Sequence, residues 1–138
     1  MSDEAREFLN SYGDFVTKVT SEPSLDQSSL DARMKEIDST SPIESARLLT
    51  AALGLGSETG EFVEIVKKMF LQGKPASEDN IFHMKRELGD VLWYWVQGCI
   101  ALGFTPDEVM DENIRKLEKR YPNGFEVVRS EVRQEGDI

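Results

Sequence analysis

The sequence is poor in the two residue types that most often bind transition metals. Its 138 residues include one cysteine, Cys99, and one histidine, His83. A single cysteine permits neither an intramolecular disulfide nor a thiolate zinc cluster. A single histidine excludes sites that require two imidazoles, such as the HExxH metalloprotease site and the paired Glu-x-x-His motifs of di-iron bundles. We therefore expect any metal site in this chain to be built from oxygen ligands.

Positive charge and long apolar runs are also scarce. The 16 Lys and Arg residues face 26 Asp and Glu residues, which gives a formal net charge of −10. This surplus argues against a nucleic-acid backbone or an anionic membrane as partner, but not against a small anion carried with its own cation. No apolar stretch reaches about 18 residues, and none follows the acidic N-terminus. We expect no membrane span, no signal peptide and a cytoplasmic location.

Length and composition favour one globular domain, with 39% hydrophobic and 30% charged residues. The hydrophobic periodicity predicts four helices and no strand. The first covers about residues 4–19 and is followed by a serine-rich connector, residues 20–41, in which residues 25–37 could form a short helix. One helical bundle is the economical interpretation.

Capping signals predict where the other three helices begin and end. Ser41-Pro42-Ile43-Glu44 has the pattern of a capping box and opens a helix that stops at Gly73-Lys74-Pro75. Ser77 can cap the next helix, which runs to about residue 102. Thr105-Pro106-Asp107-Glu108 repeats the capping-box pattern and opens a last helix that ends near Tyr121-Pro122.

Two pairs of acids lie on the second and third of these helices. Glu58 and Glu61 are three residues apart, as are Glu87 and Asp90, so each pair lies on one helix face. The spacing alone is weak evidence, because Glu4 and Glu7 share it. The residues around the two pairs are more informative than the spacing.

The third helix is apolar nearly all round, apart from a narrow polar stripe that includes Glu87 and Asp90. Such a helix is expected to be buried, and buried carboxylates need a counter-charge. Gly60 and Gly89 occupy equivalent positions in the two pairs, which suggests either a close approach of the helices or room for a ligand. Four acids meeting in a partly dry site favour a hard cation, Mg²⁺ or Mn²⁺. The alternative is ordinary salt bridges with Lys67, Lys68, Lys85 or Arg86.

Three ordered blocks of sequence resemble the MazG-like all-α nucleotide pyrophosphohydrolases, relatives of the dimeric dUTPases. The first two blocks contain the acidic pairs, Glu58-Thr59-Gly60-Glu61 and Glu87-Leu88-Gly89-Asp90. The third runs from Asn113 through Lys116 and Arg120 to Phe125. The resemblance implies an all-α, four-helix bundle-like MazG fold completed by oligomerisation, as a homodimer or homotetramer. We accordingly divide the chain into an N-terminal helix and connector, residues 1–45, a MazG-like core, residues 46–125, and a charged tail, residues 126–138.

The resemblance also implies a reaction, the Mg²⁺-dependent hydrolysis of nucleoside or deoxynucleoside triphosphates to the monophosphate and pyrophosphate, with Mn²⁺ as a substitute ion. Its metal ligands would be Glu58, Glu61, Glu87 and Asp90. A glutamate common before the first ligand is here Ser57, so the general base is open between Glu61 and Glu64. His83 is expected to be a polar partner at the rim of the site.

Cationic and aromatic residues complete the predicted site. Asn113, Lys116 and Arg120 share one face of the last helix and are expected to contact phosphate, although a solvated basic edge would have the same pattern. Lys67 and Lys68 are further phosphate-binding candidates, and either Tyr94 or Trp93 could stack on a base. The rival hypothesis is a non-catalytic MazG-like helical interaction or regulatory module.

Overall fold

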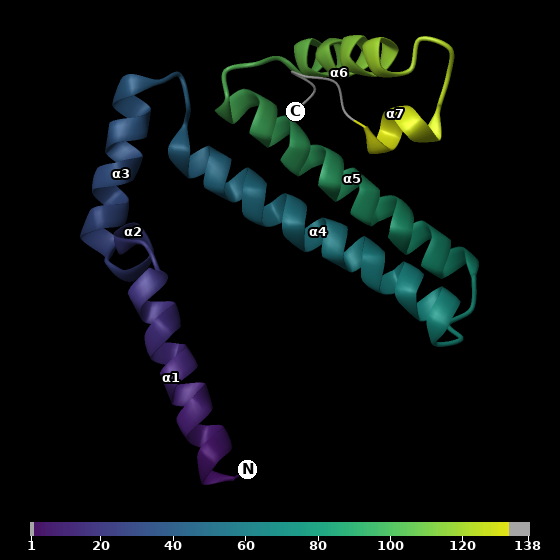
Figure 1. Ribbon diagram of the computed structural model, residues 1–138. Helices are drawn as coiled ribbons and strands as arrows, with labels where there is room; N and C mark the ends of the chain where they lie inside the picture. The colour runs from purple at the N-terminus through teal and green to yellow at the C-terminus, as the bar shows by residue number, and fades with distance from the viewer. Residues whose placement is uncertain (1, 133–138) are drawn as a thin grey trace. The chain divides into compact units, whose positions relative to one another are not determined.

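A computed structural model describes residues 2–132, in which helices are the only regular secondary structure. The helices are α1 (Asp3–Val19), α2 (Glu22–Leu25), α3 (Gln27–Thr40), α4 (Ser45–Leu71), α5 (Glu78–Ala101), α6 (Pro106–Arg120) and α7 (Val127–Glu131), shown in Figure 1. The all-α prediction is confirmed, and the four predicted helices are α1, α4, α5 and α6. No described helix is both long and apolar enough for a membrane span. The chain divides into two compact units, one ending at Ser45 and one beginning at Ala46.

In the N-terminal unit, side chains cap the helices. The Ser2 hydroxyl accepts a hydrogen bond from the Ala5 amide at 3.2 Å and caps α1, which covers the helix predicted over about residues 4–19. The connector is more helical than expected, because Asp26 caps α3 by accepting a hydrogen bond from the Ser29 amide at 2.8 Å. α3 therefore begins at Gln27 and extends beyond the predicted residues 25–37 to Thr40.

The predicted capping box at Ser41 is wrong. Ser41 ends α3 instead, since its amide and its hydroxyl both donate to the Ile37 carbonyl, at 3.0 and 2.8 Å. α4 begins at Ser45, whose amide donates to the Asp38 carboxylate at 2.8 Å. This bond holds the pKa of Asp38 below its ordinary value. An acid on the preceding helix thus satisfies a free amide at the start of α4, a partner that a local sequence pattern does not reveal.

In the C-terminal unit the predicted helix ends are confirmed. The Ser77 hydroxyl accepts from the Asn80 amide at 3.3 Å, and Thr105 and Glu108 form both bonds of a capping box. α4 stops where Gly73 adopts a positive φ of 71°, which glycine tolerates without strain.

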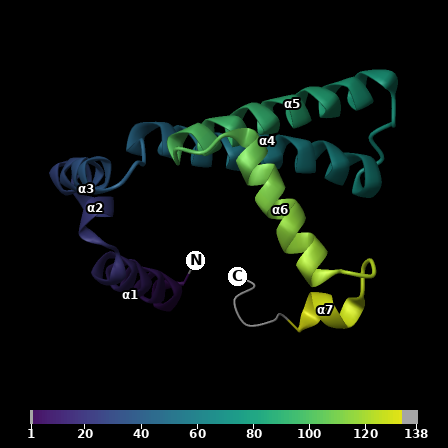
Figure 2. The same cartoon turned by 90° about the horizontal axis from the view of Figure 1, so that it is seen from above.

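α4 and α5 lie side by side and antiparallel, as both views show (Figures 1 and 2). One glycine permits this contact. A Cβ at Gly54 would lie 2.1 Å from ring atoms of Tyr94, whereas one at Gly98 would make an ordinary contact, 3.7 Å from the Ala51 methyl. The close approach that requires glycine therefore occurs at Gly54. It does not occur at Gly60, where an added Cβ would meet nothing within 4 Å, nor at Gly89, which is equally open.

The expectation that α5 is buried all round is also wrong for the single chain. Its buried residues are Glu87, Cys99 and Ala101, whereas Trp93 is 53% exposed. The physical reason is that α5 packs along α4 and contacts α6 near its C-terminal end, which leaves its other faces uncovered. Figure 2 shows α6 running away from the layer that α4 and α5 form.

The contact at Gly54 gives a stability prediction. Gly54→Ala should lower the free energy of unfolding by about 1–3 kcal/mol, because the added methyl overlaps the Tyr94 ring. Gly56→Ala is the matched control: its Cβ would meet nothing within 4 Å, so the better helix former should stabilise by up to about 1 kcal/mol. Urea denaturation measures both variants. Equal effects of the two substitutions would contradict the close contact.

Candidate metal centre

The two acidic pairs converge between α4 and α5. Carboxylate oxygens of Glu58, Glu87 and Asp90 lie within 4.8 Å of one another. Ligand atoms of Glu61, His83 and Glu87 form a second group, and these atoms also all lie within 4.8 Å of one another. The three-residue spacing places each pair on one helix face, and the antiparallel packing of α4 and α5 turns the two faces toward each other. The structure thus brings together all four acids that the sequence singled out.

Glu87 lies at the centre of the cluster and belongs to both groups. It is only 6% exposed, whereas Glu61 and Asp90 are exposed and Glu58 is half-buried. His83 Nε2 lies 2.8 Å from Glu87 Oε1, one turn earlier on α5. His83 therefore occupies the rim position expected for it, because its ring is half exposed while its contact reaches the most buried carboxylate.

The electrostatics of the cluster favour a bound cation. Partial desolvation raises the pKa of Glu58 above its ordinary value, and the three neighbouring carboxylates raise it further through their negative charge. A hydrogen bond with Glu87 acts in the same direction. Without a cation, the cluster is therefore under mutual repulsion.

The salt-bridge alternative does not describe these acids. Lys67 and Lys68 both pair with Glu64, Lys68 at 3.1 Å. Among the described residues, Lys85 and Arg86 form no ion pair with the four acids. The cluster consequently lacks a lysine or arginine counter-charge within the described part of the chain.

Glu64, the second of the two candidate bases, lies in a different environment. Hydrogen bonds from Lys67 and then Lys68 lower the pKa of its carboxyl group. A lowered pKa makes a carboxylate a weaker proton acceptor, and both lysines hold it in ion pairs. Lys67, a predicted phosphate contact, is likewise engaged with Glu64.

Tyr94 packs against the backbone of α4 at Gly54, and its ring meets the Trp93 ring edge-to-face with centroids 4.8 Å apart. Tyr94 is half-buried and lies one turn beyond Asp90 on α5. Its position at the α4–α5 contact gives it a structural role in addition to the predicted contact with a base.

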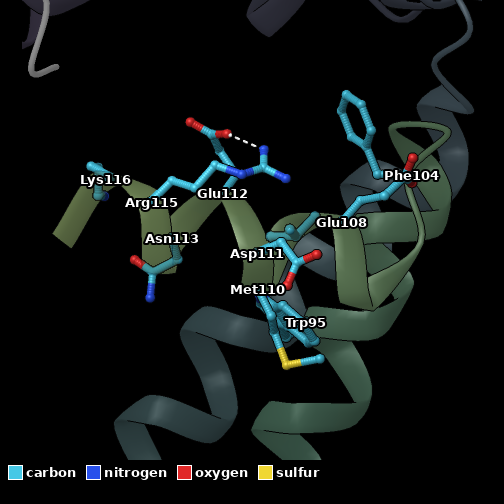
Figure 3. Close-up of a pocket in the computed structure, with 10 residues that line it drawn as sticks. Trp95, Phe104, Glu108, Met110, Asp111, Glu112, Asn113, Arg115 and Lys116 are labelled. Atoms are coloured by element: carbon cyan, nitrogen blue, oxygen red, sulfur yellow. Dashed lines mark hydrogen bonds and ion pairs between the residues drawn. The ribbon is translucent and has the colours of Figure 1, made fainter. Parts of the chain in front are cut away.

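The structure places the predicted residues of α6 apart from the four acids. Asn113 and Lys116 line a hollow of about 890 Å³ whose wall also includes Trp95 of α5 and Phe104 (Figure 3). Arg120 lies over the Tyr121 ring, with its guanidinium carbon 6.0 Å from the centroid. None of the four carboxylates lines this hollow.

A second hollow, of about 280 Å³, adjoins the carboxylate cluster. Its lining comprises Ser57, Gly60, Glu61, Glu64, Ile65, Lys68, Lys74 and His83. The sequence pattern placed Lys74 in a helix stop and did not indicate that it lines this hollow. The available signal was its place directly after Gly73, where the chain reverses toward the last turn of α4.

The raised pKa of Glu58 predicts a pH effect on the metal-free protein. A carboxyl group with a raised folded pKa contributes stability below its unfolded pKa of about 4, and loses it as pH rises through the folded pKa. Glu58→Gln should remove the loss of stability that accompanies ionisation of Glu58 as pH rises. Without metal at neutral pH, this variant should be at least as stable as wild type. It should also weaken the Mg²⁺-induced stabilisation, which for wild type is about 2.7 kcal/mol at a hundredfold excess over Kd.

Thermal melts of both proteins across pH, with EDTA or Mg²⁺, measure these effects. Glu118→Gln, which alters an exposed carboxylate of α6, is the matched control and should behave like wild type. A destabilised metal-free Glu58→Gln, together with no response of wild type to Mg²⁺, would rule out the metal centre.

Comparison with known proteins agrees with this arrangement of acids. Residues 47–125 match the MazG nucleotide pyrophosphohydrolase domain, a segment that contains the whole cluster. The "Gene 37 protein" of Mycobacterium phage L5 is 35% identical over 74 residues. That alignment covers 52% of this chain and 64% of the phage protein, so the chain spans less than two thirds of this relative. No solved structure matches the chain. The family match covers more than half of the sequence, and the chain belongs to the MazG nucleotide pyrophosphohydrolase family.

Proposed function

We propose that this protein hydrolyses nucleoside or deoxynucleoside triphosphates to the monophosphate and pyrophosphate in the presence of Mg²⁺, with Mn²⁺ as a substitute. The observation that carries the proposal is the convergence of Glu58, Glu61, Glu87 and Asp90 in a chain of the MazG family. The substrate is a small anion that brings its own cation, which is compatible with a net charge of −10.

The residues of the cluster fit a hard divalent ion. Glu58, Glu87 and Asp90 offer carboxylate oxygens close enough to share one ion, with Glu61 beside them. The raised pKa of Glu58 supports a bound cation, because desolvation and the neighbouring carboxylates disfavour its negative charge. When bound, Mg²⁺ supplies polarisation of the phosphate and neutralisation of its charge. We assign His83 to orienting Glu87 through their hydrogen bond.

Hydrolysis requires a proton acceptor beside the attacking water. The water oxygen forms a bond to the α-phosphorus, the bond from that phosphorus to the α,β-bridging oxygen breaks, and pyrophosphate leaves with the bond electrons. We propose Glu61 as the group that takes the water proton, since it lines the hollow beside the cluster. Glu64 lines the same hollow but is the weaker candidate, because two lysines lower the pKa of its carboxyl group.

We further propose that the site is completed by a second copy of the chain. Leu88 and Leu92 of α5 are each more than half exposed, and apolar patches of this kind mark interfaces. The hollow that Asn113 and Lys116 line contains none of the four acids. A substrate-binding role for Asn113, Lys116 and Arg120 therefore implies that α6 of one copy serves the cluster of another, in a homodimer or homotetramer.

The products test the reaction. Incubation with mixed deoxynucleoside triphosphates and Mg²⁺ should release monophosphates and pyrophosphate, and phosphorus NMR identifies both. Glu87→Gln should abolish the release, because Glu87 belongs to both groups of ligand atoms. A nucleoside diphosphate with inorganic phosphate would contradict cleavage between the α and β phosphates. Absence of any product from wild type would favour the non-catalytic module.

The shared site predicts complementation between inactive chains. Lys116→Ala should cost about 1.5–3 kcal/mol in kcat/KM, roughly ten- to a hundredfold, through loss of a charge-assisted phosphate contact. Co-expression of Lys116→Ala with Glu87→Gln should restore up to about a quarter of wild-type activity, because half of randomly paired dimers carry one intact site.

Light scattering gives the accompanying test of mass. A particle near 15.6 kDa at micromolar concentration would exclude the oligomer. An oligomer in which the two variants show no complementation would instead exclude the contribution of Lys116 to a neighbouring site.

A further inference from the structure

The hollow beside the carboxylate cluster has a cationic end. Lys68 and Lys74 line it together with Glu61 and His83, so it begins at the cluster and extends toward the end of α4. Glu61 and Lys68 are seven residues apart on α4, a rise of about 10 Å. An added Cβ at Gly60, in the wall of the hollow, would meet nothing within 4 Å, so this side is open to a ligand.

The end of α4 holds Lys74 in this place. The Lys74 amide donates to the Lys68 carbonyl at 3.0 Å, across the positive-φ residue Gly73. This hydrogen bond joins residues six apart and folds the chain back against the last turn of α4. The two lysines are consequently neighbours through the backbone, although six residues separate them in the sequence.

The charges around the hollow leave Lys74 available for an anion. Glu64 already pairs with both Lys67 and Lys68, so two cations share one carboxylate. Within the described part of the chain, Lys74 has no carboxylate partner at ion-pair distance. An anion that reached this end would meet Lys74 beside Lys68, which shares the Glu64 carboxylate with Lys67.

The order of groups along the two helices gives the site a direction. On α4 the order is Gly54, Glu58, Glu61 and Lys68, and on α5 it is Tyr94, Asp90, Glu87 and His83. Because the helices are antiparallel, these rows run in parallel, with Tyr94 against Gly54 at one end and His83 near Glu61 toward the other. The carboxylates lie between an aromatic end and a cationic end.

We propose that Lys74, with Lys68, binds the β- and γ-phosphates of the substrate and then the pyrophosphate product, so that the nucleoside points toward Tyr94. This inference rests on the proposed function and assigns the polarity of the substrate in that same site. A polyanion held by a cation in the cluster extends its remaining negative charge toward Lys68 and Lys74, because the hollow that adjoins the cluster has its lysines at this end.

Binding of the two products distinguishes this orientation from its reverse. In calorimetry with the full chain and Mg²⁺, Lys74→Gln should raise the Kd of inorganic pyrophosphate roughly ten- to a hundredfold and leave the Kd of deoxynucleoside monophosphates unchanged. Lys74→Arg should retain most of the pyrophosphate affinity. Lys85→Gln, which removes an exposed lysine of α5 outside the hollow, is the matched control and should bind both products like wild type.

The outcomes separate this inference from the hydrolysis itself. Unchanged pyrophosphate affinity in Lys74→Gln, an equal loss for both products, or no pyrophosphate binding by wild type would overturn the inference. If wild type hydrolyses triphosphates while Lys74→Gln binds pyrophosphate normally, the proposed hydrolysis is supported and the pyrophosphate subsite at Lys74 is excluded. If pyrophosphate binding depends on Lys74 but no triphosphate is cleaved, the pyrophosphate subsite is supported and the proposed hydrolysis is excluded. Melting temperatures confirm that each variant is folded.

Discussion

Close packing of α4 against α5 is the constraint on which the carboxylate cluster depends. Gly54 accepts the Tyr94 ring, and Gly98 lies at ordinary contact distance from the Ala51 methyl. Tyr94 lies about two helical turns from Glu87 on α5, so the contact at Gly54 helps to set the distance between the two helix faces that carry the acids.

The fold holds the four carboxylates close together although their mutual repulsion lowers the stability of the metal-free chain. Glu87 is almost fully buried, with His83 at 2.8 Å on one side and the other acids of the cluster around it. The resulting repulsion appears in the raised pKa of Glu58. Such an arrangement opposes folding of the metal-free chain, and a bound cation would relieve the repulsion, which would link ion binding to stability.

The single chain leaves two groups of predicted site residues apart. The acids lie between α4 and α5, whereas Asn113 and Lys116 line a hollow between α5 and α6. Exposed leucines on α5 and open glycines beside the acids provide the kind of surface on which another helix packs. A complete site assembled from two copies would explain why so much apolar surface is uncovered in one copy.

The sequence by itself determined the all-α class, the helix ends at Ser77 and Thr105, and the four acids. Each depends on local spacing, because caps and helix faces involve residues within about one turn of each other. Only the tertiary structure decided the rest. Asp38, seven residues away, replaced Ser41 at the start of α4, and Gly54 rather than Gly60 carried the helix contact. Glu64 acquired two lysine partners, and Lys74 was folded back onto the hollow. These features depend on which side chains meet across a turn or a helix interface, and a one-dimensional period does not specify that.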